Sequence, residues 1–415
     1  MHPFTAAFLA ALVIATLVRW WLALRHIRHV SGHRAAVPAE FEGRISLQAH
    51  QKGADYTVAR TQLSIAEALV GAVVTLAFTL GGGLQAISDL WQRLLTPDGY
   101  AHGIALIVSA ALIAGLIDLP FAWYRTFVIE ARFGFNKATL KLWVADRAKG
   151  LVLGLAIGVP LLLLVLWLMD KMGHAWWLYV WLTIIVVSLA ANLVAPFIMM
   201  WFNKFTPLDN PDLRERIEAL LAKCGFRSRG LFVIDASRRS SHGNAFFTGF
   251  GRTKRIVFFD TLLERLSPAE IEAVLAHELG HFSLRHIWKQ MALQLSTTLV
   301  LLWALAWLME NDWFYHGLGV YQTGTAMALA LFSIVAPEFT FLLHPAASLY
   351  ARHQEYEADA YAARQAPAHD LVRALVKLYE DNAATLTPDP VHSAFYDSHP
   401  PAALRIARLH SLGTI

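Results

Sequence analysis

Charged residues and cysteine are both scarce in this chain of 415 residues. Asp, Glu, Lys and Arg together make up 16% of the sequence, and the one cysteine is Cys224. A soluble globular domain carries about a quarter charged residues, so the composition excludes an ordinary soluble enzyme. A single cysteine excludes an intramolecular disulfide. Apolar residues reach 56% and the mean hydropathy is +0.44, which indicates a membrane protein.

Seven long apolar runs make up much of what is present. A bilayer core about 30 Å thick needs roughly 20 apolar residues for each helix that crosses it. The runs that meet this requirement are residues 4–24, 63–84, 102–123, 151–169, 175–197, 291–309 and 323–343. The sequence therefore predicts a mainly α, polytopic membrane protein with seven transmembrane helices.

The basic residues between these runs alternate in number along the chain. Residues 25–61 and 124–149 each contain six Lys or Arg, whereas residues 86–101 contain only Arg93 and residues 310–321 contain none. Cytoplasmic loops carry the excess of Lys and Arg, so this alternation predicts an N-terminus outside the cell.

The same topology places residues 200–288 and 346–415 in the cytoplasm.

The pI near 9.1 arises from basic residues beside apolar runs, not from a basic cluster on a soluble domain. The lipid bilayer is therefore the predicted partner, and nucleic acid is not. Residues 411–415 carry no lysine-based retrieval signal, which favours a bacterial inner (plasma) membrane.

Three charged residues lie in or beside the apolar runs: Arg19, Asp118 and Glu338. An ionised group there is costly unless it is paired or reaches water. Two interpretations stay open from the sequence. Each residue lies at a helix end and reaches the interface, or the three face a polar cavity among the helices.

Residues 200–288 break the apolar pattern and predict a small α+β domain. A charged amphipathic stretch at 212–224 precedes a strand at 231–234, and two β-rich runs flank a turn at 251–254, as in a hairpin. We divide the chain into a membrane domain (1–199), a catalytic insertion (200–288), two further spans (289–345) and a C-terminal segment that completes the catalytic domain (346–415).

The sequence His277-Glu278-Leu279-Gly280-His281 is the motif HExxH. It follows a capping box at Ser267-Pro268-Ala269-Glu270, which starts a helix. On a helix, His277 and His281 project from one face and can bind one zinc ion, and Glu278 lies beside the open position of the metal. The motif predicts a zinc hydrolase with one Zn2+ per chain and Glu278 as general base.

A catalytic zinc site needs a third protein ligand. Acidic residues downstream concentrate at Glu355, Glu357 and Asp359, in a segment expected to be helical because it follows the seventh span. Glu355 and Asp359 share one helix face, so Glu355 is the preferred ligand, with Asp359 bonded to a ligand histidine. The residues alone leave Glu357 open as the alternative ligand.

Several sequence blocks together resemble one known family, the integral-membrane zinc endopeptidases of the CAAX prenyl protease 1 type. The blocks stand in the order of that family and cover nearly the whole chain. They are Glu130–Lys137 (EARFGFNK), Ser241–Phe246 (SHGNAF), His277–His281 with His286, Glu355–Asp359 (EYEAD), and His399-Pro400-Pro401 with Arg405.

The resemblance implies that His277, His281 and Glu355 bind zinc. It further implies that Glu278 is the general base and acid, that Asp359 supports a ligand, and that His399 and Arg405 face the metal as oxyanion donors. Asn244 and Ala245 would lie on an edge strand that pairs with an extended peptide substrate. The expected fold is a chambered barrel of seven helices, capped by a zincin-like domain.

Two function classes remain from the sequence. The favoured one is a membrane zinc endopeptidase, whose substrates are prenylated CAAX C-termini or membrane and misfolded proteins cut for quality control. The alternative is a seven-helix transporter or receptor with a structural zinc site. The FGFNK segment is interpreted as a structural or path-lining element without a chemical role, so Asn136 is not counted among the site residues.

Overall fold

The computed structural model describes residues 2–248 and 253–412 of the chain. Within them, seven helical stretches are long and apolar enough to cross a membrane, so the predicted number of spans is confirmed. The helices that make up these stretches are α1 (Pro3–Gly32), α2 (Leu47–Phe78), α4 (Tyr100–Tyr124), α5 (Leu140–Lys171), α6 (Trp176–Phe202), α10 (His286–Leu308), and α12 (Thr325–Thr340) with α13 (His344–Gln365).

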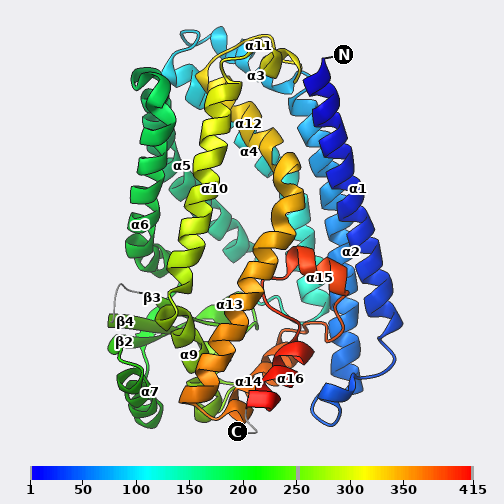
Figure 1. Ribbon diagram of the computed structural model, residues 1–415, viewed down its shortest axis with the longest axis vertical. Coiled ribbons are helices and arrows are strands. Elements are labelled where there is room, and N and C mark those ends of the chain that lie inside the picture. The colour runs from blue at the N-terminus through cyan, green and yellow to red at the C-terminus, as the bar shows by residue number, and fades with distance from the viewer. Residues whose placement is uncertain (1, 249–252, 413–415) are drawn as a thin grey trace.

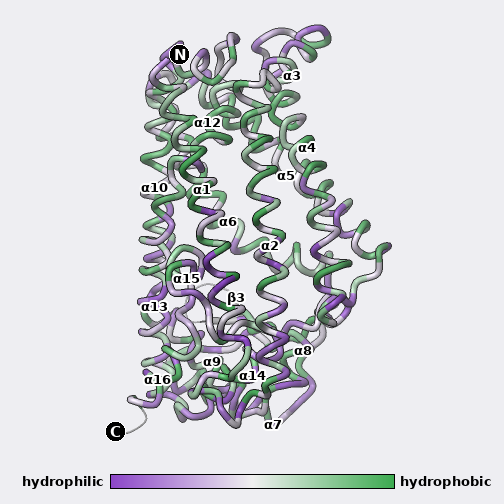
Figure 2. Tube along the Cα trace, turned by 90° about the vertical axis from the view of Figure 1, so that its right-hand side faces the viewer, coloured by the Kyte–Doolittle hydropathy of each residue, from purple (hydrophilic) through white to green (hydrophobic). Residues whose placement is uncertain are grey.

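Short helices close the two ends of this bundle. At the end that holds the N-terminus, α3 (Gly83–Gln92) and α11 (Asp312–His316) lie across the tips of the long helices (Figure 1). Hydrophobic residues predominate along the long helices, and hydrophilic residues gather at the opposite end, around α7 (Pro211–Lys223), α14 (Ala368–Asp381) and α16 (Ala402–Leu412) (Figure 2).

A small sheet lies at that hydrophilic end. Its four strands are β1 (Phe205–Pro207), β2 (Arg227–Ile234), β3 (Ala245–Thr248) and β4 (Thr253–Phe259), in the order β1-β2-β4-β3. β3 pairs antiparallel with β4, with Ala245 opposite Phe258, so the predicted hairpin is confirmed. Residues 249–252, which include part of its predicted turn, and residues 413–415 lie outside the described residues.

The sheet packs on the helix that carries HExxH, α9 (Pro268–Ser283), to form one apolar core. The Ser267 side chain accepts the Glu270 N–H, and the Glu270 carboxylate accepts the Ser267 N–H at 2.7 Å. This pair of bonds is the predicted capping box. The core joins α9 to α7, α14 and α16, with Ile271, Leu275 and Leu279 fully buried. Short α8 (Asp260–Leu263) and α15 (Pro390–Tyr396) complete the fold.

Two of the long helices continue past their apolar parts toward the sheet. α4 runs into a π-helical turn, Arg125–Glu130, and α12 continues through a short 3-10 turn, Phe341–Leu343, into α13. The segment that carries Glu355 is thus a direct extension of the last span. The division of the chain into four parts stays a prediction.

A cavity of about 880 Å³, the interior cavity, lies where α1 and α2 approach the hydrophilic end of the molecule. Arg19 lines it and forms an ion pair with Glu338 at 2.8 Å. Of the two interpretations above, the polar cavity is the one that describes this pair. Asp118 is exposed on α4. The cavity lies between α1, α2 and the segments around β3, α14 and α15.

The FGFNK segment has a structural role. Phe133 and Phe135 are buried and pack on Tyr56 of α2. Asn136 forms an isolated β-bridge with Ser240, just before the edge strand β3. The segment therefore joins the membrane helices to the sheet.

Candidate functional site

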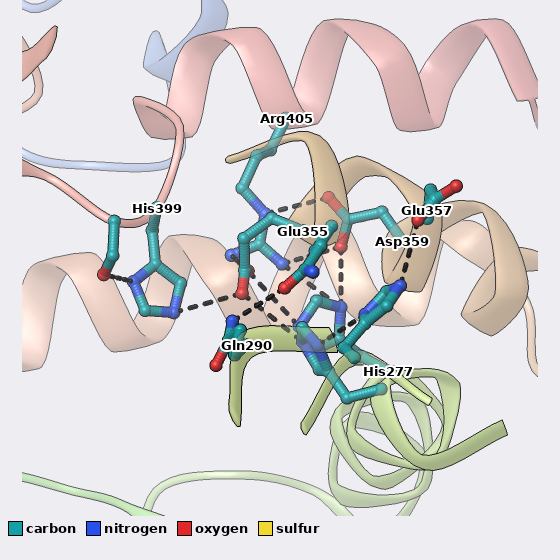
Figure 3. A network of polar contacts seen from close by, with 11 residues as sticks. His277, Gln290, Glu355, Glu357, Asp359, His399 and Arg405 are labelled. Carbon is teal, nitrogen blue, oxygen red and sulfur yellow. Dashed lines mark hydrogen bonds and ion pairs between the residues drawn. The ribbon is translucent and has the colours of Figure 1, made fainter. Parts of the chain in front are cut away.

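Two helices bring three ligand-type side chains together. His277 and His281 lie one turn apart on α9, and Glu355 faces them from α13 (Figure 3). Their ligand atoms all lie within 4.8 Å of one another. The carboxylate of Glu355 is 3.4 Å from His277 Nε2 and 3.3 Å from His281 Nε2. The preferred third residue, Glu355, is thus the one that reaches the histidine pair.

The two helices can approach because Gly280 lies between the histidines. A Cβ at this position would lie 3.1 Å from Ala358 Cα and 3.2 Å from Ala358 O. Both are backbone atoms, so a side chain here would push α13 away. The glycine of the motif therefore allows the separation at which Glu355 meets the two imidazoles.

A buried network fixes the orientation of His277. Its Nδ1 donates to Asp359 Oδ1 at 2.9 Å, and Asp359 accepts two further bonds from Arg405, at 2.9 and 2.6 Å. A bond from Nδ1–H leaves the Nε2 lone pair facing Glu355, where a metal would bind. Asp359 and Arg405 are 0% and 5% exposed, so water does not compete for these bonds.

A second relay fixes His281. Its Nδ1 lies 3.0 Å from His286 Nδ1, and His286 Nε2 lies 2.9 Å from Glu357. A carboxylate only accepts, so His286 Nε2 donates to Glu357 and a neutral His286 has an acceptor at Nδ1. His281 Nδ1–H then donates to it, which leaves His281 Nε2 free for a metal. This assignment follows from the hydrogen-bond network.

The His286–Glu357 pair was not among the predicted site residues. Glu357 appeared as an alternative ligand and His286 as part of a family block, but neither pattern indicated that they form a pair. His286 begins α10, directly after Arg285, whose φ of +59° produces a sharp turn behind α9. That turn returns His286 to His281, and no sequence periodicity predicts it.

The three residues fit a bound metal ion. Glu355 Oε2 is buried and makes no hydrogen bond with the described residues, although His277 Nε2 and Arg405 Nη1 lie 3.4 and 3.5 Å away, so a metal ion between the ligands would complete its contacts. Burial lowers the pKa of His277, but Asp359 and Glu355 outweigh burial and raise that pKa to about 9. Two imidazole nitrogens and one carboxylate oxygen form the ligand set of a catalytic transition-metal site.

Comparison with known proteins identifies the family. The description "CAAX prenyl protease N-terminal, five membrane helices" matches residues 26–204, and "Peptidase family M48" matches residues 207–412. CAAX prenyl protease 1 of Saccharomyces cerevisiae is 37% identical over 74% of this chain and 72% of its own. The chain belongs to the CAAX prenyl protease 1 family of M48 peptidases. A homologue from Arabidopsis thaliana is 31% identical over 97% of both chains.

The solved structures agree with this assignment. The crystal structure of S. mikatae Ste24p matches with a TM-score of 0.92 and 32% identity, over 99% of both chains. The chain is therefore a membrane-embedded metalloprotease. Membership in a peptidase family favours the enzyme over the transporter or receptor considered from the sequence.

The remaining predicted residues of this M48 peptidase surround the ligand set. Glu278 is half-buried and forms no hydrogen bond or ion pair with the described residues. His399 is 61% exposed, and its Nε2 lies 3.4 Å from Glu355 Oε1. Arg405 contacts Glu355 at 3.5 Å from the buried side. In Figure 3, His399 approaches Glu355 from the left and Arg405 from above, so the two contact it from different sides.

Asn244 and Ala245 lie where the edge strand begins. Ala245 is the first residue of β3, and Asn244 precedes it, with its carbonyl accepting the Phe259 N–H at 3.0 Å. β3 pairs only with β4 among the described strands, so its other edge is open to a peptide. Asn244 also lines the interior cavity, so this edge of the sheet borders that cavity.

We expect Gly280→Ala to weaken metal binding. Overpacking against backbone costs about 1–3 kcal/mol, and the gain in helix propensity of about 1 kcal/mol offsets only part of this. Because α13 must move, Glu355 separates from the histidines, and we expect bound metal after dialysis to fall about tenfold. Gly115→Ala, where a Cβ meets nothing within 4 Å, is the matched control. Full metal occupancy in Gly280→Ala would contradict the packing argument.

Metal affinity should rise with pH from 7 to 8. Without metal, His277 holds a proton up to a pKa of about 9, and a metal ion must displace that proton. Loss of one proton on binding raises the affinity about tenfold per pH unit below that pKa. Chelator competition, corrected for protonation of the chelator, measures this slope. Asp359→Asn should reduce the slope of metal affinity against pH. A wild-type metal affinity that does not depend on pH would show that metal binding does not displace a proton from His277.

Proposed function

We propose that this chain is a zinc endopeptidase that hydrolyses peptide bonds inside a membrane chamber. The observation that carries the proposal is the meeting of His277, His281 and Glu355 beside Glu278. Two nitrogen ligands and one oxygen ligand, with further positions left for substrate and water, suit a catalytic zinc ion, whereas calcium and magnesium prefer oxygen ligands throughout. A structural zinc site would need a fourth protein ligand.

In this mechanism, a zinc ion held by His277, His281 and Glu355 would polarise the scissile carbonyl as a Lewis acid and would lower the pKa of a bound water. Glu278 takes the proton of the attacking water on a carboxylate oxygen and passes it to the nitrogen of the leaving amine. Its freedom from other partners suits this role, because no bond has to break first. His399 Nε2–H donates to the oxyanion that develops on the carbonyl, from the exposed side of the site.

Arg405 has a different role in this proposal from that of His399. Both of its short hydrogen bonds go to Asp359, on the buried side of His277. We therefore assign Arg405 and Asp359 to the positioning of His277, and not to direct contact with the oxyanion. The positive charge of Arg405 also compensates the carboxylates of Asp359 and Glu355 in a site with little water.

The proposed substrates are proteins with prenylated CAAX-type C-termini. The relatives carry the name CAAX prenyl protease 1, and this chain matches them over most of its length. An extended segment can pair with the open edge of β3 at Ala245, while Asn244 contacts it at the cavity wall. Membrane or misfolded proteins cut for quality control form the competing substrate class.

We propose that the N-terminus lies outside and the catalytic end in the cytoplasm. The basic loops 25–61 and 124–149 support this orientation through the positive-inside bias. The N-terminus and the sheet also lie at opposite ends of the bundle, as that topology requires (Figure 1). A bacterial inner membrane remains a prediction, which the eukaryotic relatives named above do not support.

Replacing Glu278 with Gln should abolish peptide cleavage and leave zinc bound. The amide cannot accept the proton of water, and loss of a general base costs about 10² to 10⁴ in rate. The measurement pairs cleavage rate with zinc content by atomic absorption. Glu272→Gln, on the same helix but paired with Arg216, is the control and should cut normally. Activity near wild type in Glu278→Gln would remove Glu278 from the mechanism.

The substrate class is tested with a farnesylated CAAX peptide and its unmodified twin. Purified wild-type protein in detergent should cut the farnesylated peptide faster, since its prenyl chain adds apolar contact in a bundle lined by apolar helices. Glu278→Gln serves as the blank. Equal rates on both peptides would favour the quality-control class, and cleavage of neither would refute the proposed function.

A further inference from the structure

The polar wall of the interior cavity lies largely on one face of α2. Tyr56, Arg60, Ser64 and Glu67 all line it. Their spacing of four, four and three residues places them on one side of a helix, over about three turns. A membrane helix with such a polar stripe toward its own bundle indicates a wet interior surface that contacts polar ligands.

Three arginines line this cavity, and two of them are in ion pairs. Arg19 pairs with Glu338 and Arg125 with Glu67. Arg60 forms no ion pair within the part of the chain that the structure describes. Its guanidinium lies over the ring of Tyr56, 5.5 Å from the centroid, and the side chain is exposed to the cavity.

The polar groups near Arg60 bond to other residues. The hydroxyl of Tyr56 donates to Glu130, and the second carboxylate oxygen of Glu130 lies 3.4 Å from His242 Nε2. Glu130 is therefore occupied by two other groups and lies beyond ion-pair distance of Arg60. It ends the π-helical turn Arg125–Glu130, a local widening of the helix that is frequent at functional sites.

The cavity also borders segments that lead to the catalytic site. Asn244, before the edge strand, lines its wall, and so does Asp397, two residues before His399. The cavity next to the cutting site therefore presents one guanidinium, that of Arg60, without an ion-pair partner among the described residues.

We propose that Arg60 binds the terminal carboxylate of the peptide substrate. This inference rests on the proposed function, and it adds a specificity determinant to it. A C-terminal motif of four residues keeps the terminal carboxylate within about 13 Å of any bond in the motif, so the carboxylate enters the cavity with the bond. Guanidinium and carboxylate form paired, charge-assisted hydrogen bonds.

The test compares two farnesylated CAAX peptides that differ only at the C-terminus, one a free acid and one a carboxamide. Wild type should cut the acid with a kcat/KM about tenfold or more above that of the amide, mainly through KM, as expected for a lost charge-assisted bond. Arg60→Gln should lower kcat/KM for the free-acid peptide to the value for the carboxamide, and it should leave kcat/KM for the carboxamide unchanged. Arg60→Lys should retain part of the preference.

The rate on the amide is the internal control, because a misfolded variant or a purely structural role for Arg60 would lower both rates together. Arg93→Gln, at the far end of the bundle, is the matched control and should keep the full preference. Equal rates on acid and amide in wild type, a preference that survives Arg60→Gln, or equal loss on both peptides would overturn the inference while the protease remains. Failure of wild type to cut either peptide would refute the proposed function, and this inference with it.

Discussion

The close contact of α9 with α13 at Gly280 and Ala358 is the constraint on which the site depends. The three ligand residues come from segments 74 residues apart, between His281 and Glu355, and two membrane spans lie between them. The backbone of Ala358 can approach only because residue 280 has no side chain. The relays behind the ligands, through Asp359 and through Glu357, start from the same turn of α13. The helix contact therefore sets the ligand distance and both histidine orientations together.

The membrane helices have a direct part in this arrangement. α12 continues into α13, and α10 begins at His286, so both spans end inside the catalytic network. A change in the packing of either span would move Glu355 or His286 relative to α9. The catalytic centre is therefore not a soluble domain fixed to an anchor, because two of its parts are the ends of transmembrane helices.

Sequence reasoning succeeded where a pattern has a local physical cause. Seven apolar runs predict seven spans, and the capping box with HExxH places a histidine pair on one helix face. It left open what depends on contacts between distant segments. Glu355 and Glu357 lie on different faces of one helix, and only the packing of α13 decides which of them meets the histidines. The strand β1 and the His286–Glu357 pair were missed for the same reason, since their partners are remote in sequence.

A chamber among the helices answers a requirement that the bilayer imposes. An extended substrate has backbone N–H and C=O groups that cannot stay unpaired in hydrocarbon. Within the chamber, the open edge of β3 can satisfy part of that backbone, and water can satisfy the rest. The internal ion pairs of Arg19 and Arg125 follow the same rule, because each charge that faces the chamber needs a counter-charge or water. A peptide bond can then be hydrolysed at the membrane without exposing either protein or substrate backbone to lipid.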